Sequence, residues 1–197
     1  CDDPEAPTIV FAHGYCLNQD SWHFQRKALR GRARLVLWDQ RHHGRSEAGP
    51  LENATIEQLG RDLQYVLDAY TQGPVTLVGH SMGGMTVMSL AAQFPDTFED
   101  RVKAVAFVAT SAGDLSTEFL GLPPGAAARA RAIATSIQPT GAVVGRFMQQ
   151  ARYTDLNFAI TKRGSFGPGA PNSLNLFTVA MLNATPVETV VAFLPTL

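Results

Sequence analysis

Residues 79–84 read Gly-His-Ser-Met-Gly-Gly and follow directly on the apolar run Val75–Val78. An apolar strand, the pattern Gly-x-Ser-x-Gly and then a helix are together the sequence form of a nucleophile elbow, a sharp turn that raises one serine hydroxyl above a parallel sheet. Gly79 and Gly83 suit such a turn, because the helix returns close to the strand and leaves no room for a Cβ atom. The sequence therefore predicts that Ser81 is a nucleophile.

The chain up to residue 110 alternates strand and helix patterns. The apolar run at residues 8–12 is typical of a central strand buried on both faces. Thr55 begins a capping-box sequence, and apolar residues from Ile56 to Tyr70 recur at helical spacing, which predicts an amphipathic helix lying on a sheet. Other segments are expected to form a helix capped by Asp20 or Ser21, a strand at residues 34–38 and another buried strand at residues 102–109. The alternation predicts an α/β fold, with a parallel β-sheet and helices on both faces.

The pattern changes after residue 110. Segments of helical period alternate with breaks rich in glycine and proline, at residues 127–137, 143–151 and 174–182. No strand pattern lies between them, and an inserted helical lobe of this kind typically covers a site. We therefore expect three parts, namely a core portion in residues 1–110, a helical lid in residues 111–191 and the start of a return to the core in residues 192–197.

The composition favours a small-molecule partner over a nucleic acid. The 197 residues include 16 Lys and Arg against 17 Asp and Glu, and the basic cluster Arg30–Arg34 is too short for a nucleic-acid footprint. No apolar stretch approaches the roughly 18 residues that a membrane-spanning helix needs. Cys1 and Cys16 form neither a disulfide framework nor a metal site, so we expect no metal and no other cofactor. The compartment and the oligomeric state stay open.

Two further motifs extend the pattern around the elbow. His13-Gly14-Tyr15 follows the first predicted strand, and residues 39–46 read Asp-Gln-Arg-His-His-Gly-Arg-Ser after the second. In this order the three motifs resemble the α/β-hydrolase superfamily, specifically its lidded esterase, lipase and peroxidase-like members. His42 stands where that family usually has glycine. Since histidine is tolerated at positive φ more often than most residues, we expect the turn to be kept.

The resemblance implies a serine hydrolase that cleaves a carboxylic ester through an acyl-enzyme. Ser81 Oγ would attack the acyl carbonyl, while the backbone amides of Tyr15 and Met82 would hold the oxyanion. Serine at position 81 argues against dehalogenase and epoxide hydrolase chemistry, which in this family uses a carboxylate nucleophile. Thioesterase, carbon–carbon bond hydrolase and perhydrolase activities stay open, because they differ in pocket shape rather than in the elbow.

The rest of the catalytic triad is harder to place, because the family's chain order is serine, acid, histidine. All five histidines of the chain precede Ser81, and each has a structural reading at a turn or on a helix. Asp114, just beyond the last predicted strand, is the candidate acid, and a helix cap opening the lid is its alternative.

We therefore expect the histidine base, and in the usual arrangement the acid, to lie outside this chain. The chain would then be an internal portion of a longer enzyme, beginning at what resembles the third strand of the family fold. The competing hypothesis is a non-catalytic binder that holds a small molecule in the same lidded pocket. On that hypothesis the native chain would end near Leu197.

Overall fold

The computed structural model describes residues 5–47, 49–112 and 155–197. The chain divides into two units, Cys1–Ala112 and Gly113–Leu197. Asp114 and the predicted helical segments 127–137 and 143–151 lie outside the described residues. The predicted division into core, lid and return therefore stays a prediction.

The first unit is built on a parallel four-stranded sheet in which the strand order differs from the chain order. The order across the sheet is β2-β1-β3-β4, with bounds Thr8–Ala12 for β1, Arg34–Leu37 for β2, Val75–His80 for β3 and Val102–Val108 for β4. Strand β1 pairs with β3 from Thr8 opposite Val75 to Ala12 opposite Gly79. The carboxyl ends of these two strands therefore lie side by side. The loop His13-Gly14-Tyr15 after β1 and the elbow at residues 79–84 after β3 thus meet at the carboxyl end of the sheet.

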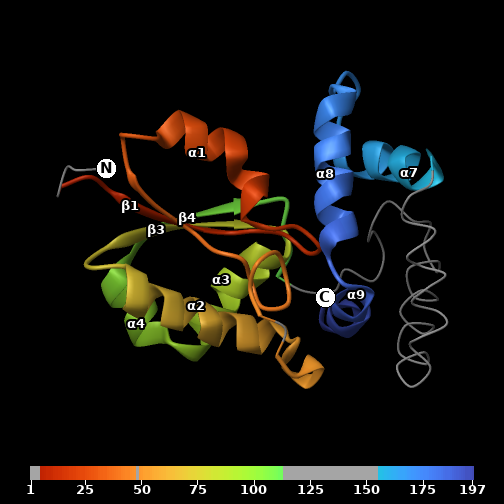
Figure 1. The fold of residues 1–197 in the computed structure, drawn as a ribbon. Coiled ribbons are helices and arrows are strands. Elements are labelled where there is room, and N and C mark those ends of the chain that lie inside the picture. Colours follow the sequence, from red (N-terminus) through yellow and green to blue (C-terminus); the bar gives the residue numbers. More distant parts are fainter. Residues whose placement is uncertain (1–4, 48, 113–154) are drawn as a thin grey trace. The chain divides into compact units, whose positions relative to one another are not determined.

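Helices cover both faces of this sheet (Figure 1). The short 3-10 helix η1 leads into α1 on one face, and α2, α3 and α4 lie on the other. Their bounds are Gln19–Trp22 for η1, His23–Leu29 for α1, Leu51–Asn53 for the 3-10 helix η2, Ile56–Tyr70 for α2, Met82–Gln93 for α3 and Pro95–Arg101 for α4. The arrangement confirms the predicted α/β fold with helices on both faces of a parallel sheet.

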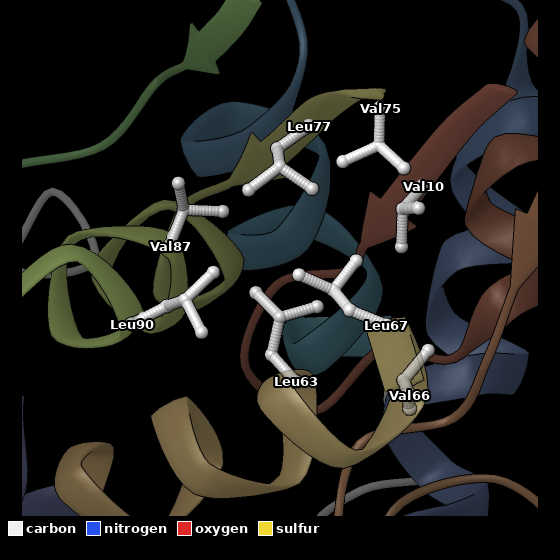
Figure 2. Packing of buried hydrophobic residues seen from close by; sticks show 8 residues of the cluster. All are labelled: Val10, Leu63, Val66, Leu67, Val75, Leu77, Val87 and Leu90. Carbon is white, nitrogen blue, oxygen red and sulfur yellow. The ribbon is translucent and has the colours of Figure 1, made fainter. Parts of the chain in front are cut away.

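A hydrophobic core joins α2 and α3 to the sheet (Figure 2). Leu63 and Leu67 recur one turn apart on α2, so they share a face, and both are fully buried. They pack with side chains of α3 and of the central strands, namely Val87, Leu90, Val10, Val75 and Leu77. The predicted cap is also present, because the Thr55 hydroxyl accepts a hydrogen bond of 3.1 Å from the amide of Gln58. This core fixes α3, and with it the turn that precedes α3.

Two local expectations were wrong. The first helix begins earlier than expected, and the side chain of Asn18, rather than Asp20 or Ser21, caps it. Five of the seven residues of β4 are exposed, since β4 lies at an edge of the sheet that the described residues form.

The described part of the second unit is helical. It contains α7, α8, α9 and the 3-10 helix η4, at Asp155–Ser165, Asn172–Ala184, Val187–Phe193 and Leu194–Thr196. The break between α8 and α9 falls at Thr185-Pro186. Within the described ranges, no single helix has the length and apolarity to cross a membrane. The stretch Asn172–Ala184 with Val187–Thr196 passes that test only as a pair bent by 87°.

Candidate active site

Ser81 occupies a strained turn between β3 and α3. Its backbone has φ 50° and ψ −120°, a left-handed region that non-glycine residues rarely adopt. The amide of Ser81 donates a hydrogen bond of 3.0 Å to the carbonyl of Val108, and its carbonyl accepts one of 2.8 Å from Gly84. The hydroxyl of Thr110 donates a further bond of 2.7 Å to the same carbonyl. The turn geometry predicted for an elbow is therefore present. Hydrogen bonds to α3 and to the segment at the end of β4 stabilise its strained backbone.

The glycines of the elbow are sterically required. A Cβ atom on Gly83 would overlap the carbonyl oxygen of Ala12, and one on Gly79 would lie 2.6 Å from the carbonyl oxygen of Gly83. Backbone atoms cannot move aside as the end of a side chain can. Helix α3 can therefore approach β1 and β3 this closely only with glycine at both positions.

The loop after β1 lies beside Ser81. A Cβ atom added to Gly14 would lie 3.3 Å from Ser81 Cβ and 2.7 Å from Nδ1 of His80. The Gly14–Tyr15 peptide, whose amide is one predicted oxyanion donor, is thus near the predicted nucleophile. Met82 carries the other predicted donor as the first residue of α3, where a helix amide has no intrahelical acceptor. That both amides bind one oxyanion stays a prediction.

Two of the five histidines are held in one neutral tautomer by backbone groups. The amide of Gln40 donates to Nε2 of His13 at 2.9 Å, and the amide of Cys16 donates to Nε2 of His43 at 3.2 Å. Nε2 must therefore be unprotonated on both rings, and Nδ1–H donates to a carbonyl, that of Gly14 for His13 and that of Arg41 for His43. Burial lowers the pKa of His13 to about 3 and that of His43 to about 4. With both nitrogens committed, neither ring is free to act as a general base.

The other three histidines also have structural positions. His42 is buried with φ 64°, as expected for the position where the family favours glycine, and burial lowers its pKa. His80 lies edge-on to Trp22 at a ring separation of 6.4 Å, and burial lowers its pKa as well. His23 is exposed at the start of α1. The described residues show no hydrogen bond between these rings and Ser81, and the expectation that the base lies elsewhere stays a prediction.

Asp39 organises the turn after β2 and is not a candidate acid. One carboxylate oxygen accepts a hydrogen bond of 2.7 Å from the amide of Gln19, and the other accepts one of 2.8 Å from the amide of Arg45. Burial alone would raise the pKa of Asp39, but these bonds outweigh burial and hold the pKa below its ordinary value. Arg41, two residues after Asp39, donates two hydrogen bonds of 2.8 and 2.6 Å to the carboxylate of Asp62 on α2. These contacts tie the turn to η1 and to α2.

Sequence reasoning missed two residues that support the site, Gln40 and Thr86. The Gln40 side chain donates to the carbonyl of His13 at 2.5 Å and accepts from the Thr86 hydroxyl at 2.7 Å. Gln40 stands inside the quoted motif at residues 39–46, so its position carried a signal. Its partners lie 27 and 46 residues away in the chain, and only the folded structure reveals them.

The described parts of the chain contain no group of three or more potential metal ligands.

Comparison with known proteins agrees with this geometry. The family model described as "alpha/beta hydrolase fold" matches residues 7–176. The chain therefore belongs to the alpha/beta hydrolase fold family.

The chain is similar to several hydrolases. It is 40% identical over 99 residues to the sn-1-specific diacylglycerol lipase ABHD11 of Mus musculus, which covers 49% of the chain and 32% of that protein. It is 38% identical over 85 residues to 3-oxoadipate enol-lactonase 1 of Acinetobacter baylyi, which covers 43% of the chain and 31% of that protein. The fold of an esterase from Exiguobacterium antarcticum matches with a TM-score of 0.71 at 19% identity, over 98% of this chain and 66% of that one. The aligned regions span about a third of the two curated relatives.

Proposed function

We propose that the protein containing this chain is a hydrolase that cleaves a carboxylic ester through an acyl-enzyme on Ser81. The observation that carries the proposal is the strained backbone of Ser81, φ 50°, at the start of α3 and beside the Gly14–Tyr15 loop. Strain of this kind costs of order 1–3 kcal/mol and is typically kept where function needs it. The similar proteins named as a lipase, a lactonase and an esterase support the same class of bond.

In the proposed mechanism Ser81 Oγ attacks the acyl carbonyl and forms a tetrahedral intermediate. The amides of Tyr15 and Met82 donate hydrogen bonds to its oxyanion, a contribution of roughly 2.7 to 4 kcal/mol for one such donor. A histidine from outside this chain takes the serine proton and returns it to the leaving alcohol. Water then hydrolyses the acyl-enzyme through the same base. Asp114 remains the candidate acid within the chain.

Residues 111–191 are proposed as a lid that borders the acyl pocket and selects among ester substrates. A lid excludes water from the reacting atoms, which strengthens the hydrogen bonds to the oxyanion. Residues 192–197 would lead back toward the core. No cofactor and no metal takes part in this scheme, since serine, histidine and backbone amides supply the nucleophile, the base and the oxyanion site.

The proposal is tested on the full-length protein with p-nitrophenyl esters and a fluorophosphonate probe. Ser81→Ala is expected to lower kcat by a factor of about 10⁶ and to abolish labelling, which peptide mass spectrometry should locate on Ser81 in the wild type. Ser89→Ala is the matched control, because Ser89 lies on the same helix and its hydroxyl accepts a hydrogen bond of 2.9 Å from the side chain of Gln93. Ester hydrolysis that persists in Ser81→Ala would overturn the proposal.

A second candidate function is a non-catalytic small-molecule binder of the same fold. One observation favours it, namely that no histidine follows Ser81 in the chain and that backbone groups bond both ring nitrogens of His13 and of His43. A full-length protein that binds esters by calorimetry, yet neither hydrolyses them nor reacts with the fluorophosphonate, would establish it over the enzyme.

A further inference from the structure

Gln40 is a fully buried polar residue in the turn after β2, and each of its four polar groups has a partner. Its amide donates to Nε2 of His13 at 2.9 Å, and its side-chain Nε2 donates to the carbonyl of the same residue at 2.5 Å. Its side-chain Oε1 accepts from the hydroxyl of Thr86 at 2.7 Å, and its carbonyl accepts from the amide of His43 at 2.9 Å. A buried amide with a partner at each polar group is rigid, because breaking any of these bonds leaves a polar group unsatisfied.

The orientation of the Gln40 amide follows from its partners. The carbonyl of His13 can only accept a hydrogen bond, so the –NH₂ group must face it. The carbonyl oxygen of the side chain then faces Thr86, whose hydroxyl can donate. Gln40 therefore links the loop after β1 to helix α3 through one short side chain.

This link lies where the sheet no longer controls the backbone. The ladder between β1 and β3 ends at the pair Ala12 and Gly79. His13 and Ser81 lie beyond it, and so do the two amides proposed to bind the oxyanion. Thr86 is one helical turn after Met82, and its hydroxyl lies 3.0 Å from the Met82 carbonyl. Through Gln40, the residue before Gly14 is therefore tied to helix α3 at Thr86, one turn after Met82.

We propose that Gln40 is a positioning residue that sets the separation of the Tyr15 and Met82 amides. The inference rests on the proposed function and adds to it a residue that controls its rate. Hydrogen-bond donors stabilise an oxyanion only when they are fixed before the charge develops. A displacement of about 1 Å in such a site can cost about 10²-fold in rate. Substrate binding before the reaction does not depend on these donors to the same extent, so the effect should fall on kcat.

The test uses the full-length protein with Gln40→Met, Thr86→Val and the double variant. Gln40→Met keeps the length of the side chain and removes both of its hydrogen bonds. We expect kcat to fall between about 10-fold and 10²-fold, with KM within about twofold. Affinity for a boronic acid, which forms a tetrahedral adduct on the serine, should fall by the same factor. The double variant should be no slower than Gln40→Met alone, because the two residues act through one bond.

Thr71→Val is the matched control for a loss of stability alone. The Thr71 hydroxyl is also buried and also donates to a helix carbonyl, that of Leu67 at 2.7 Å. This control should lower the stability to urea and leave kcat and boronate affinity unchanged. A Gln40→Met protein that is folded and keeps kcat within about twofold of the wild type would overturn the proposal. So would a loss of kcat in Thr71→Val as large as that in Gln40→Met.

Gln40→Glu keeps the proposal testable if Gln40→Met does not fold. A protonated Glu side chain can donate to the carbonyl of His13, whereas the ionised form repels it. We expect this variant to approach wild-type kcat at low pH and to lose activity as the introduced acid ionises, a transition absent from the wild type. A parallel pH profile for variant and wild type would overturn the proposal. An inactive wild type would instead show that the proposed function itself has failed.

Discussion

The hydroxyl of Thr110 donates a hydrogen bond of 2.7 Å to the carbonyl of Ser81. On the other side of the same residue, the Ser81 amide donates to the carbonyl of Val108, the last residue of β4. The segment at the end of β4 thus holds both backbone groups of the strained serine. Because strain at φ 50° favours relaxation of the turn, these two bonds help to keep the nucleophile in place.

Replacement of Thr110 by valine tests this relationship, because valine keeps the shape of the side chain and removes the hydroxyl. We expect Thr110→Val to lower the free energy of unfolding by about 1 kcal/mol and to lower kcat for ester hydrolysis several-fold. Urea unfolding and steady-state kinetics measure the two effects. Thr110→Ser, which keeps the hydroxyl, should preserve most of kcat. Equal kcat values for Thr110→Val and the wild type would show that the bond does not support the nucleophile.

Gly83→Ala is expected to destabilise the protein by about 2 kcal/mol or more, because the added methyl group overlaps the Ala12 carbonyl and forces α3 away from β1. Gly167→Ala is the matched control, since a Cβ atom there meets nothing within 4 Å. Urea unfolding of the two variants measures the difference. A Gly83→Ala protein as stable as the control would mean that α3 does not lie as close to β1 as the structure has it.

The features that the sequence predicted correctly are those that depend on local sterics. The elbow at Ser81 follows from glycines within a few residues of it, and the cap at Thr55 follows from a hydrogen bond to Gln58 in the same turn. The strand at residues 8–12 could be recognised because burial on both faces leaves a continuous apolar run.

The features that the sequence did not predict depend on contacts between distant segments. The motif at residues 39–46 marks the position of Gln40, but nothing local shows that its side chain is buried, because its partners come from two other segments of the chain. The exposed side chains of β4, with Phe107 at 50%, contradict an apolar pattern that is typical of a buried strand. An apolar pattern identifies a strand, but it does not show whether other parts of the chain cover the side chains of that strand. Asp114 and the oxyanion pair Tyr15 and Met82 stay predictions.

Stability should fall in mild acid because of the buried histidines. Their folded-state pKa values, about 3 for His13 and about 4 for His43, lie below the ordinary 6.5. Between about pH 6.5 and pH 4 the unfolded chain binds protons that the folded chain does not. As the pH is lowered through this range, the free energy of unfolding should therefore decrease by about 1.4 kcal/mol per pH unit for each of the two histidines.

Urea unfolding at pH 7, 6 and 5 measures this slope. His43→Gln should be less stable at pH 7 but show a shallower dependence on pH, because one of the titrating groups is gone. His23→Gln, at an exposed position on α1, should keep the slope of the wild type. An unchanged slope in His43→Gln would mean that His43 is not the buried neutral ring that its contacts indicate.

Asp39→Asn tests the turn that carries Gln40. The two carboxylate oxygens of Asp39 accept from different backbone amides, those of Gln19 and Arg45. An asparagine has one accepting oxygen, so in either orientation its –NH₂ group faces an N–H donor. The resulting unsatisfied, buried amide should cost about 1–3 kcal/mol. Because the pKa of Asp39 is lowered on folding, its stabilising effect is complete at pH 7 and is lost only as the pH falls below the ordinary value of 3.8.

The matched control is Asp20→Asn, which removes a carboxylate from an exposed ion pair with Arg45 at 3.1 Å. Such pairs contribute at most about 1 kcal/mol, so this variant should unfold in urea close to the wild type. If the turn positions Gln40, Asp39→Asn should also lower kcat while the control leaves it unchanged, with both measured well below the unfolding temperature. A stability loss under about 0.5 kcal/mol for Asp39→Asn would show that the turn tolerates the lost acceptor. The hydrogen bonds of Asp39 would then not be what holds the turn in place.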